Sequence, residues 1–325
     1  MRAVICRDWC EPDGLEVADL PSPPLTDGGV RIRVRAAGVN FADTLLLAGK
    51  YQVKPPFPFS PGLEIAGEVL ECAAGVTRVK PGDRVMAILD YGGYAEDVVA
   101  PETDVFAIPD TMDFATAAAF PIAYGTSHIG LKDKLGLARG ETLLVTGAAG
   151  GVGLTAVEIG KKLGAVVIAT AGGADKLAVA KEFGADHLID YREEDIRERA
   201  KELTDGRGVD AVYDAVGGGT FEAALRAAAP LARMLVVGFA AGDVQQIPAN
   251  ILLVKNVTAI GYYWGAHRTL APDLIASSFD ELLAWYADGD LKPHVSMTFP
   301  MAEAAAALNA LKSRKSTGKV VIEIG

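Results

Sequence analysis

Apolar and polar positions alternate in the first third of the chain, in short runs separated by proline- and glycine-rich turns. Alternation with a period of two is typical of half-buried β-strands, and such closely spaced strands indicate a barrel-like domain. One helix is expected between about Asn40 and Gly49. The predicted strands are Arg2–Cys6, Val30–Ala36, Glu64–Glu71, Arg84–Leu89 and Gly93–Val99.

The pattern changes at Phe114. Asp113 is a predicted N-cap for a short helix over 115–120, and residues 124–134 predict a longer helix. Apolar, β-branched runs then alternate with helical segments, which predicts a doubly wound parallel sheet. The predicted strands are Thr142–Thr146, Ala165–Thr170, His187–Asp190, Val209–Asp214, Met234–Gly238 and Thr258–Gly261, and the helices between them lie near Gly151–Leu163, Lys176–Phe183, Glu193–Leu203 and Thr220–Ala228.

The C-terminal segment returns to the β-rich pattern. Helices are predicted near Ser278–Ala287 and Met301–Ser313, and a last strand at Lys319–Ile324 has an alternation that fits the first domain better than the parallel sheet. The sequence therefore predicts an α/β protein in which a nucleotide-binding domain, residues 121–264, is inserted into a β-rich catalytic domain formed by residues 1–120 and 265–325.

A glycine-rich turn, Val145-Thr-Gly-Ala-Ala-Gly-Gly-Val-Gly153, joins the first predicted parallel strand to its helix. A strand followed by clustered glycines and a helix is typical of a dinucleotide-binding unit, with the pyrophosphate at the helix N-terminus. Gly153 is expected to let helix and strand pack closely, whereas Ala148 replaces the first glycine of the usual G-x-G-x-x-G pattern. The residues expected to approach the pyrophosphate are Gly150, Gly151 and Val152.

The residues after the second parallel strand indicate which nicotinamide cofactor is bound. An NAD site usually carries an acidic residue there, which binds the ribose 2′-hydroxyl. Here the strand ends in Ala171-Gly172-Gly173, which leaves room for the 2′-phosphate of NADPH, and Lys176 supplies positive charge. Tyr191, after the third strand, closes the same pocket. Two alternatives stay open: Lys176 is an ordinary solvated helix lysine, or Asp175 replaces the missing acid and favours NADH.

The chain of 325 residues has a formal net charge of −11. This charge argues against nucleic acid or an anionic membrane as partner, but it allows an anionic cofactor that is held by backbone amides. The three cysteines, Cys6, Cys10 and Cys72, form no disulfide framework. The first residues are too few for the apolar region of a signal peptide, and no apolar run approaches the length of a membrane span. We therefore expect a cytoplasmic protein.

Three segments together resemble the medium-chain dehydrogenase/reductase superfamily: Ala36–Asp43, Ser60–Glu68 and the glycine-rich turn. Zinc-dependent alcohol dehydrogenases of that superfamily place a cysteine at the position of Asn40 and a histidine at the position of Leu63. Because neither asparagine nor leucine is a zinc ligand, we expect no metal. The chain therefore resembles the zinc-independent quinone oxidoreductase branch, to which zeta-crystallin belongs. Members of this branch keep the Asn-x-x-Asp pattern and prefer NADPH.

This resemblance implies that the inserted domain is a Rossmann fold and that the β-rich domain is GroES-like, with the substrate in a cleft between them. The residues implied to line the cleft are Asn40, Asp43, Tyr51, Tyr124, Thr126, Phe239, Tyr263 and Trp264. The full set of expected cofactor-binding residues is Asn40, Thr126, Gly150, Gly151, Val152, Gly172, Lys176, Tyr191, Gly238, Phe239, Tyr263 and Trp264.

Asn40, Asp43 and Tyr51 are the candidate catalytic residues. Asn40 orients the nicotinamide or donates to a substrate carbonyl in one interpretation and caps a helix in another, and the two are compatible. Asp43 has the alternative role of stabilising the first helical turn. Tyr51 stands where mitochondrial-type enoyl reductases place a proton-donating tyrosine, but quinone reductases also have a tyrosine there.

Three functions remain open. Because no metal polarises the acceptor, the first is an NADPH-dependent reductase that transfers hydride to electron-poor quinones or related α,β-unsaturated carbonyls. The second is an enoyl-thioester reductase for acryloyl-CoA-like substrates, with Lys50, Lys54 and Arg268 as basic residues for the phosphates of the carrier. The third is a non-enzymatic, crystallin-like NADPH-binding protein. The resemblance also implies a homodimer that pairs around Val257–Gly261.

Overall fold

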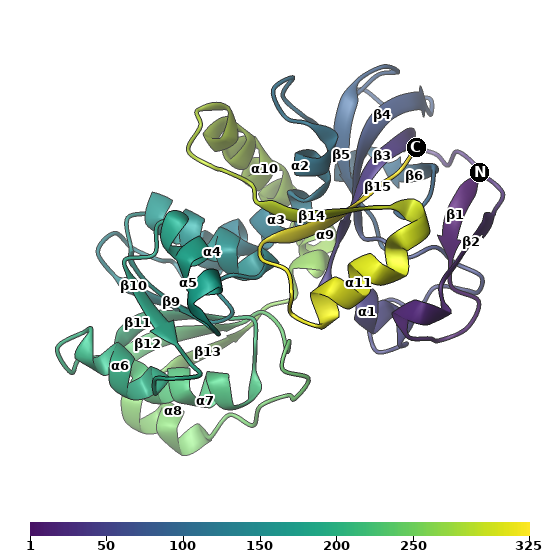
Figure 1. Cartoon of the computed structure of the whole chain (residues 1–325). Helices are drawn as coiled ribbons and strands as arrows, with labels where there is room; N and C mark the ends of the chain where they lie inside the picture. The colour runs from purple at the N-terminus through teal and green to yellow at the C-terminus, as the bar shows by residue number, and fades with distance from the viewer. The chain divides into compact units, whose positions relative to one another are not determined.

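The computed structural model describes residues 1–325, which divide into two compact units (Figure 1). Unit 1 consists of Met1–Ala123 and Phe279–Gly325, and unit 2 consists of Tyr124–Ser278. The second boundary therefore falls later in the chain than the expected 264/265. None of the helices is both long enough and apolar enough to cross a membrane.

Unit 1 is built on a seven-stranded sheet with the order β14-β15-β3-β4-β5-β7, in which β6 also pairs with β3. The long central strand β3 pairs antiparallel with both β4 and the last strand β15, so the C-terminal strand belongs to this sheet, as its alternation predicts. The elements of unit 1 are β1 (Arg2–Ile5), β2 (Glu16–Asp19), β3 (Gly29–Val39), α1 (Phe41–Leu47), β4 (Glu64–Cys72), β5 (Arg84–Ile88), β6 (Asp97–Pro101), β7 (Val105–Ala107), α2 (Phe114–Ala118), β14 (Val295–Pro300), α11 (Ala304–Lys312) and β15 (Lys319–Glu323).

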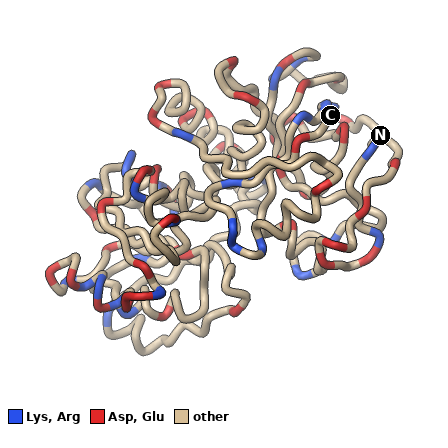
Figure 2. Tube along the Cα trace, in the orientation of Figure 1, with Lys and Arg blue, Asp and Glu red and all other residues tan.

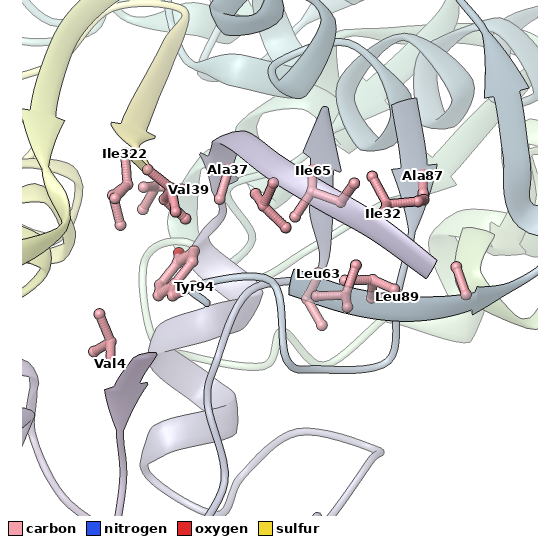
Figure 3. Close-up of a cluster of buried hydrophobic side chains, with 14 of the residues drawn as sticks. Val4, Ile32, Ala37, Val39, Leu63, Ile65, Ala87, Leu89, Tyr94 and Ile322 are labelled. Atoms are coloured by element: carbon pink, nitrogen blue, oxygen red, sulfur yellow. The ribbon is translucent and has the colours of Figure 1, made fainter. Parts of the chain in front are cut away.

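The core of unit 1 joins the inner face of this sheet to the first strand and to α1 and α11. Val4, Ile32 and Ile65 are almost completely buried in it, together with Leu46 and Leu308 from the helices. Figure 3 shows side chains from β1, β3, β4, β5 and β15 converging in this cluster, with the ring of Tyr94 among them. A core formed by both ends of the chain explains why neither terminal segment folds as a separate domain.

Unit 2 contains a parallel six-stranded sheet with the order β10-β9-β8-β11-β12-β13. This order confirms the predicted doubly wound sheet, and the chain changes direction between β8 and β11. Figure 1 shows α4 and α5 on one face of the sheet and α6, α7 and α8 on the other. The elements are β8 (Thr142–Val145), α4 (Gly151–Lys162), β9 (Val166–Ala171), α5 (Ala174–Glu182), β10 (His187–Asp190), α6 (Ile196–Glu202), β11 (Val209–Asp214), α7 (Gly218–Ala227), β12 (Ala228–Val236), α8 (Ala249–Lys255), β13 (Thr258–Gly261) and α9 (His267–Leu270).

Two helices run across the unit boundaries. The predicted helix 124–134 is α3 (Pro121–Ile129) followed by one π-helical turn over Gly130–Lys134. The second is α10 (Pro272–Ala287), which begins before the predicted Ser278. Asp113 caps α2 as predicted, because its carboxylate accepts a hydrogen bond from the backbone N–H of Thr116 at 2.7 Å.

The strand predicted at Gly93–Val99 begins later, at Asp97. The backbone N–H groups of Gly92, Gly93 and Tyr94 instead donate to carbonyls of the segment Ser60–Gly62, at 2.7 to 3.0 Å. This loop-to-loop pairing replaces the ladder that regular alternation suggests. The short strands β2, β7 and β14 were not predicted: β7 has only three residues, and β14 ends in a proline at the sheet edge.

Candidate functional site

The glycine-rich turn of unit 2 has the tight geometry that a dinucleotide-binding turn requires. Gly147 has a φ of +61°, and Gly150 stands at the N-cap position of α4. A Cβ added to Gly153 would lie 2.1 Å from the carbonyl oxygen of Gly147, so only glycine fits there. The predicted close packing of helix and turn at Gly153 is therefore confirmed, and the N-terminus of α4 opens at the carboxyl end of β8.

A buried polar pair marks the place where the strand order reverses. The Thr146 hydroxyl donates to Asp214 Oδ1 at 2.6 Å, and the backbone N–H of Gly217 donates to Asp214 Oδ2 at 3.0 Å. Both side chains are fully buried, and burial raises the pKa of Asp214. The pair joins the carboxyl ends of β8 and β11, where doubly wound sheets bind their ligands. Sequence reasoning missed it, although a carboxylate at the end of an apolar strand is a usable signal.

Two side chains cover the end of β9. A Cβ on Gly172 would lie 2.7 Å from the Tyr191 hydroxyl and 2.8 Å from Arg192 Nε, so the missing side chain leaves space that these two groups occupy. A Cβ on Gly173 would lie 3.3 Å from Arg192 Nη1. The structure thus brings Tyr191 to Gly172, as expected for a closed pocket, and adds a guanidinium that sequence reasoning missed. In the sequence, only the position of Arg192 next to Tyr191 points to this role.

A carboxylate close to Gly173 and Arg192 accepts hydrogen bonds from the backbone. Asp190, the last residue of β10, accepts the N–H of Gly173 on Oδ2 and the N–H of Arg192 on Oδ1, both at 3.0 Å. It therefore fixes the two loops against each other. Asp175 and Lys176 both lie in the first turn of α5, where Asp175 is exposed and Lys176 is half-buried.

The aromatic residues after β12 and β13 divide into buried and exposed ones. Tyr262 is buried and its hydroxyl donates to the backbone carbonyl of Thr126 at 3.1 Å. Trp264 is also buried, and its ring lies against Gly125, where a Cβ would come within 2.5 Å. Tyr263 is 40% exposed and Phe239, which follows Gly238, is 37% exposed. Tyr263 and Phe239 are thus exposed at the surface, whereas Trp264 and Thr126 are buried.

In unit 1 the Asn40 side chain is held at both ends of its amide. Its oxygen accepts a hydrogen bond from Lys319 Nζ at 2.7 Å, and Nδ2 donates to Glu64 Oε1 at 2.8 Å. Lys319 Nζ and Glu64 Oε1 are themselves 2.7 Å apart, and both side chains are buried. Asn40 also occupies the N-cap position of α1. The buried ion pair therefore fixes the orientation of the Asn40 amide, and its contact with nicotinamide or substrate stays a prediction.

Asp43 lies beside Asn40 and is fully buried. Its Oδ2 accepts the backbone N–H of Asn40 at 2.7 Å and the hydroxyl of Tyr94 at 2.9 Å, whereas Oδ1 is buried with no hydrogen-bond partner. Burial raises the pKa of Asp43 to about 7, although both hydrogen bonds favour the ionised form. Asp43 does stabilise the first turn of α1, but as a carboxyl group that readily takes up a proton.

Tyr51 follows α1 in a loop that begins at Gly49. Its side chain is half-buried and packs against the core of unit 1. The two positions that carry zinc ligands in alcohol dehydrogenases hold Asn40, whose amide is committed as described, and Leu63, which is 5% exposed in the core. No group of three His, Cys, Asp or Glu side chains is arranged to hold a metal ion.

The raised pKa of Asp43 predicts a pH-dependent stability. Asp43 titrates near its ordinary value of 3.8 in the unfolded chain and near 7 in the folded chain. The folded state therefore binds the proton more tightly, and its stability falls as the pH rises from about 4 to about 7. Relative to Asp43→Asn, the unfolding free energy of the wild-type protein should fall by up to about 1.4 kcal/mol per pH unit in this window. Urea unfolding at pH 5, 6, 7 and 8 measures it.

A second variant, at Tyr94, tests whether Asp43 is the group that titrates. Because the Tyr94 hydroxyl favours the ionised form of Asp43, Tyr94→Phe should raise the folded-state pKa, so that the fall in stability still begins near pH 4 but continues to a higher pH. Parallel stability curves for the wild-type protein and Asp43→Asn would contradict the assigned titration.

Comparison with known proteins agrees with these features. Residues 26–110 match the family model described as an alcohol dehydrogenase GroES-like domain, and residues 151–285 match that of a zinc-binding dehydrogenase. The quinone oxidoreductase-like protein 2 homolog of Nematostella vectensis is 44% identical over 324 residues, which are 99% of this chain and 88% of that protein. A quinone oxidoreductase of Pseudomonas aeruginosa is 36% identical, over 96% of each chain.

A solved structure shares the fold over the whole length. The quinone oxidoreductase of Escherichia coli, crystallised in complex with NADPH, superposes with a TM-score of 0.93 at 30% identity and covers 100% of both chains. Together with the GroES-like and Rossmann units, these matches show that the chain belongs to the zinc-independent quinone oxidoreductase branch of the medium-chain dehydrogenase/reductase superfamily.

Proposed function

We propose that the protein is an NADPH-dependent reductase that transfers hydride to quinones or to other α,β-unsaturated carbonyl compounds, without a metal. The observation that carries the cofactor assignment is the guanidinium of Arg192 beside the side-chain-free Gly172, where an NAD site usually has a carboxylate. The names of the relatives and the NADPH bound in the Escherichia coli structure support this assignment.

The residues of unit 2 fit the parts of the cofactor. Arg192, Tyr191 and Lys176 would hold the 2′-phosphate, because a guanidinium and an ammonium bind phosphate strongly. Gly150, Gly151 and Val152 would hold the pyrophosphate with backbone N–H groups at the N-terminus of α4. The remaining parts of the cofactor would be contacted by the exposed rings of Tyr263 and Phe239, together with Gly238, Thr126 and Trp264. When bound, NADPH supplies the hydride.

The absence of zinc-ligand residue types at Asn40 and Leu63 restricts the acceptor. Without a Lewis acid, the acceptor carbon must already be electron-poor, as it is in a quinone or an enone. We propose that Tyr51 donates a proton to the reduced oxygen, since a phenol is a suitable acid at neutral pH. The amide of Asn40 is held by Lys319 and Glu64 and would therefore keep one fixed orientation.

The proposed function predicts a defined substrate profile. Purified protein should oxidise NADPH in the presence of quinones or enones, and Tyr51→Phe should lower kcat about tenfold or more without a comparable change in the KM for NADPH. Absorbance at the nicotinamide band, measured against a panel of quinones, enones and acyl-CoA thioesters, tests both statements. Fast turnover of an enoyl-CoA with none of a quinone would assign the thioester-reductase function instead. NADPH binding without any turnover would favour the crystallin-like function.

The position of Arg192 predicts the cofactor preference. A hydrogen bond to a charged group contributes about 1.5–3 kcal/mol, so Arg192→Ala should raise the KM for NADPH roughly ten- to hundredfold and leave that for NADH nearly unchanged. Arg226→Ala, which removes an exposed arginine from the last turn of α7, is the charge-matched control. Equal effects of Arg192→Ala on the two cofactors would remove Arg192 from the 2′-phosphate site.

We also propose a homodimer formed at the open edge of the unit 2 sheet. Strand β13 pairs with β12 only, and α8, which leads into β13, exposes Leu253 and Val254 at 76% each. An exposed edge and large apolar side chains favour association with a second copy.

Light scattering should therefore give about twice the chain mass of 34.0 kDa. The double variant Leu253→Glu, Val254→Glu should be monomeric, because the new charges would be buried unpaired. Leu270→Glu, at a residue that is 78% exposed on α9, should leave the dimer intact. A monomeric wild-type protein at micromolar concentration would overturn the proposal.

A further inference from the structure

Two thiols lie in contact near the N-terminus. Cys6 Sγ and Cys10 Sγ are 3.7 Å apart, and both cysteines are free. Cys6 is fully buried, whereas Cys10 is partly exposed. The third cysteine, Cys72, donates to the carbonyl oxygen of Val79 and contacts neither of the other two through sulfur. Of these two neighbouring thiols, Cys10 is therefore accessible to solvent and Cys6 is not.

The backbone around the pair fixes both thiols. Cys6 exchanges two backbone hydrogen bonds with Phe59, at 2.8 and 3.1 Å, and the N–H of Cys10 donates to the carbonyl of Leu47 at the end of α1, at 2.9 Å. A Cβ on Gly14 would lie 2.8 Å from the Cβ of Cys10, so glycine is needed to seat Cys10. The contact of the two sulfur atoms is thus imposed by contacts outside the turn that joins them.

We propose that Cys6 and Cys10 form a redox-active dithiol, which hydroperoxides convert reversibly into an intramolecular disulfide. This role goes beyond the proposed reductase activity and does not rest on it. A disulfide has an S–S distance of about 2.05 Å, so the sulfur atoms must approach by about 1.7 Å. Rotation of the two cysteine side chains, with a small shift of the turn that joins them, must supply this movement.

The chemistry has two steps and a defined order. The accessible Cys10 thiolate attacks the hydroperoxide, so that an S–O bond forms, the O–O bond breaks and the alcohol or water leaves. The sulfur of Cys6 then attacks Cys10 Sγ, the S–S bond forms, the S–O bond breaks and water leaves. The dithiol loses two electrons and the hydroperoxide gains them. Burial raises the pKa of Cys6 to about 12, which agrees with its action as the second thiol rather than the first.

Formation of the disulfide would change the surroundings of Trp9, which lies in the turn between the two cysteines. The Trp9 ring packs on Gly49, where a Cβ would come within 2.8 Å of it, and meets Phe57 edge-on at a centroid distance of 4.6 Å. Gly49 begins the loop that carries Tyr51. A movement of the sulfur atoms therefore changes the packing of Trp9 against this loop.

Mass spectrometry tests the proposal directly, because Arg7 lies between the two cysteines. The folded full-length protein is treated with hydrogen peroxide, then unfolded in urea that contains iodoacetamide so that the buried Cys6 is also blocked, and digested with trypsin without reduction. We expect a disulfide-linked pair of the peptides 3–7 and 8–31, which dithiothreitol separates. Little sulfenic acid should accumulate on Cys10 of the wild-type protein, because Cys6 is held in contact with it and closes the disulfide quickly.

Variants separate the roles of the thiols. Cys72→Ser should form the link at the wild-type rate, whereas Cys6→Ser should accumulate a dimedone-trappable sulfenic acid on Cys10. The tryptophan fluorescence change on oxidation should be lost in Trp9→Phe. If both thiols of the wild-type protein remain alkylatable, or Cys10 goes directly to the sulfinic acid, the proposal is overturned. None of these readouts depends on turnover of NADPH, so the result is independent of the proposed reductase activity.

Discussion

The organisation of unit 1 depends on the buried ion pair between Lys319 and Glu64, whose charged atoms are 2.7 Å apart. Burying two charges is costly unless their other hydrogen-bonding capacity is satisfied. Here Lys319 Nζ also donates to the carbonyl of Val39 and to Asn40, and Glu64 accepts the backbone N–H of Ile122 at 2.8 Å. One pair therefore ties together the first residues of β15, β4 and α3 and the junction of β3 with α1. Loss of either partner would leave the other charge buried without compensation.

The same pair connects the fold to the candidate chemistry. Gly38 makes room for it, because a Cβ there would lie 2.5 Å from Glu64 Oε1 and 2.3 Å from the carbonyl of Ala118. The ion pair in turn orients the amide of Asn40, and the backbone of Asn40 binds Asp43. The close packing at Gly38, the start of α1 and the orientation of the Asn40 amide therefore depend on one another. A side chain that is held in this way keeps one orientation.

Local patterns predicted the fold well because strands, caps and glycine turns are local features. The doubly wound sheet and the packing at Gly153 follow from period and spacing. The networks behind the site were missed because they join residues far apart in the chain. Lys319 and Glu64 are 255 positions apart, and Thr146 and Asp214 are 68 apart. A single segment can mark one member as unusual, as the carboxylate at the end of β11 does, but it does not show which distant residue pairs with it. Arg192 was missed because an exposed arginine after a strand resembles any solvated residue until its neighbour Gly172 is placed.

The acidic net charge of −11 does not oppose the binding of an anionic cofactor, because local geometry sets the field at its phosphates. Figure 2 shows basic and acidic residues interspersed along both units, with no single basic stripe. At the end of β9 the nearby carboxylate of Asp190 accepts two backbone N–H groups, including that of Arg192 itself. These bonds direct the carboxylate toward the backbone and leave the guanidinium facing the glycines. A preference for a phosphate at this corner can therefore arise from the orientation of one acid and one base, whatever the charge of the whole chain.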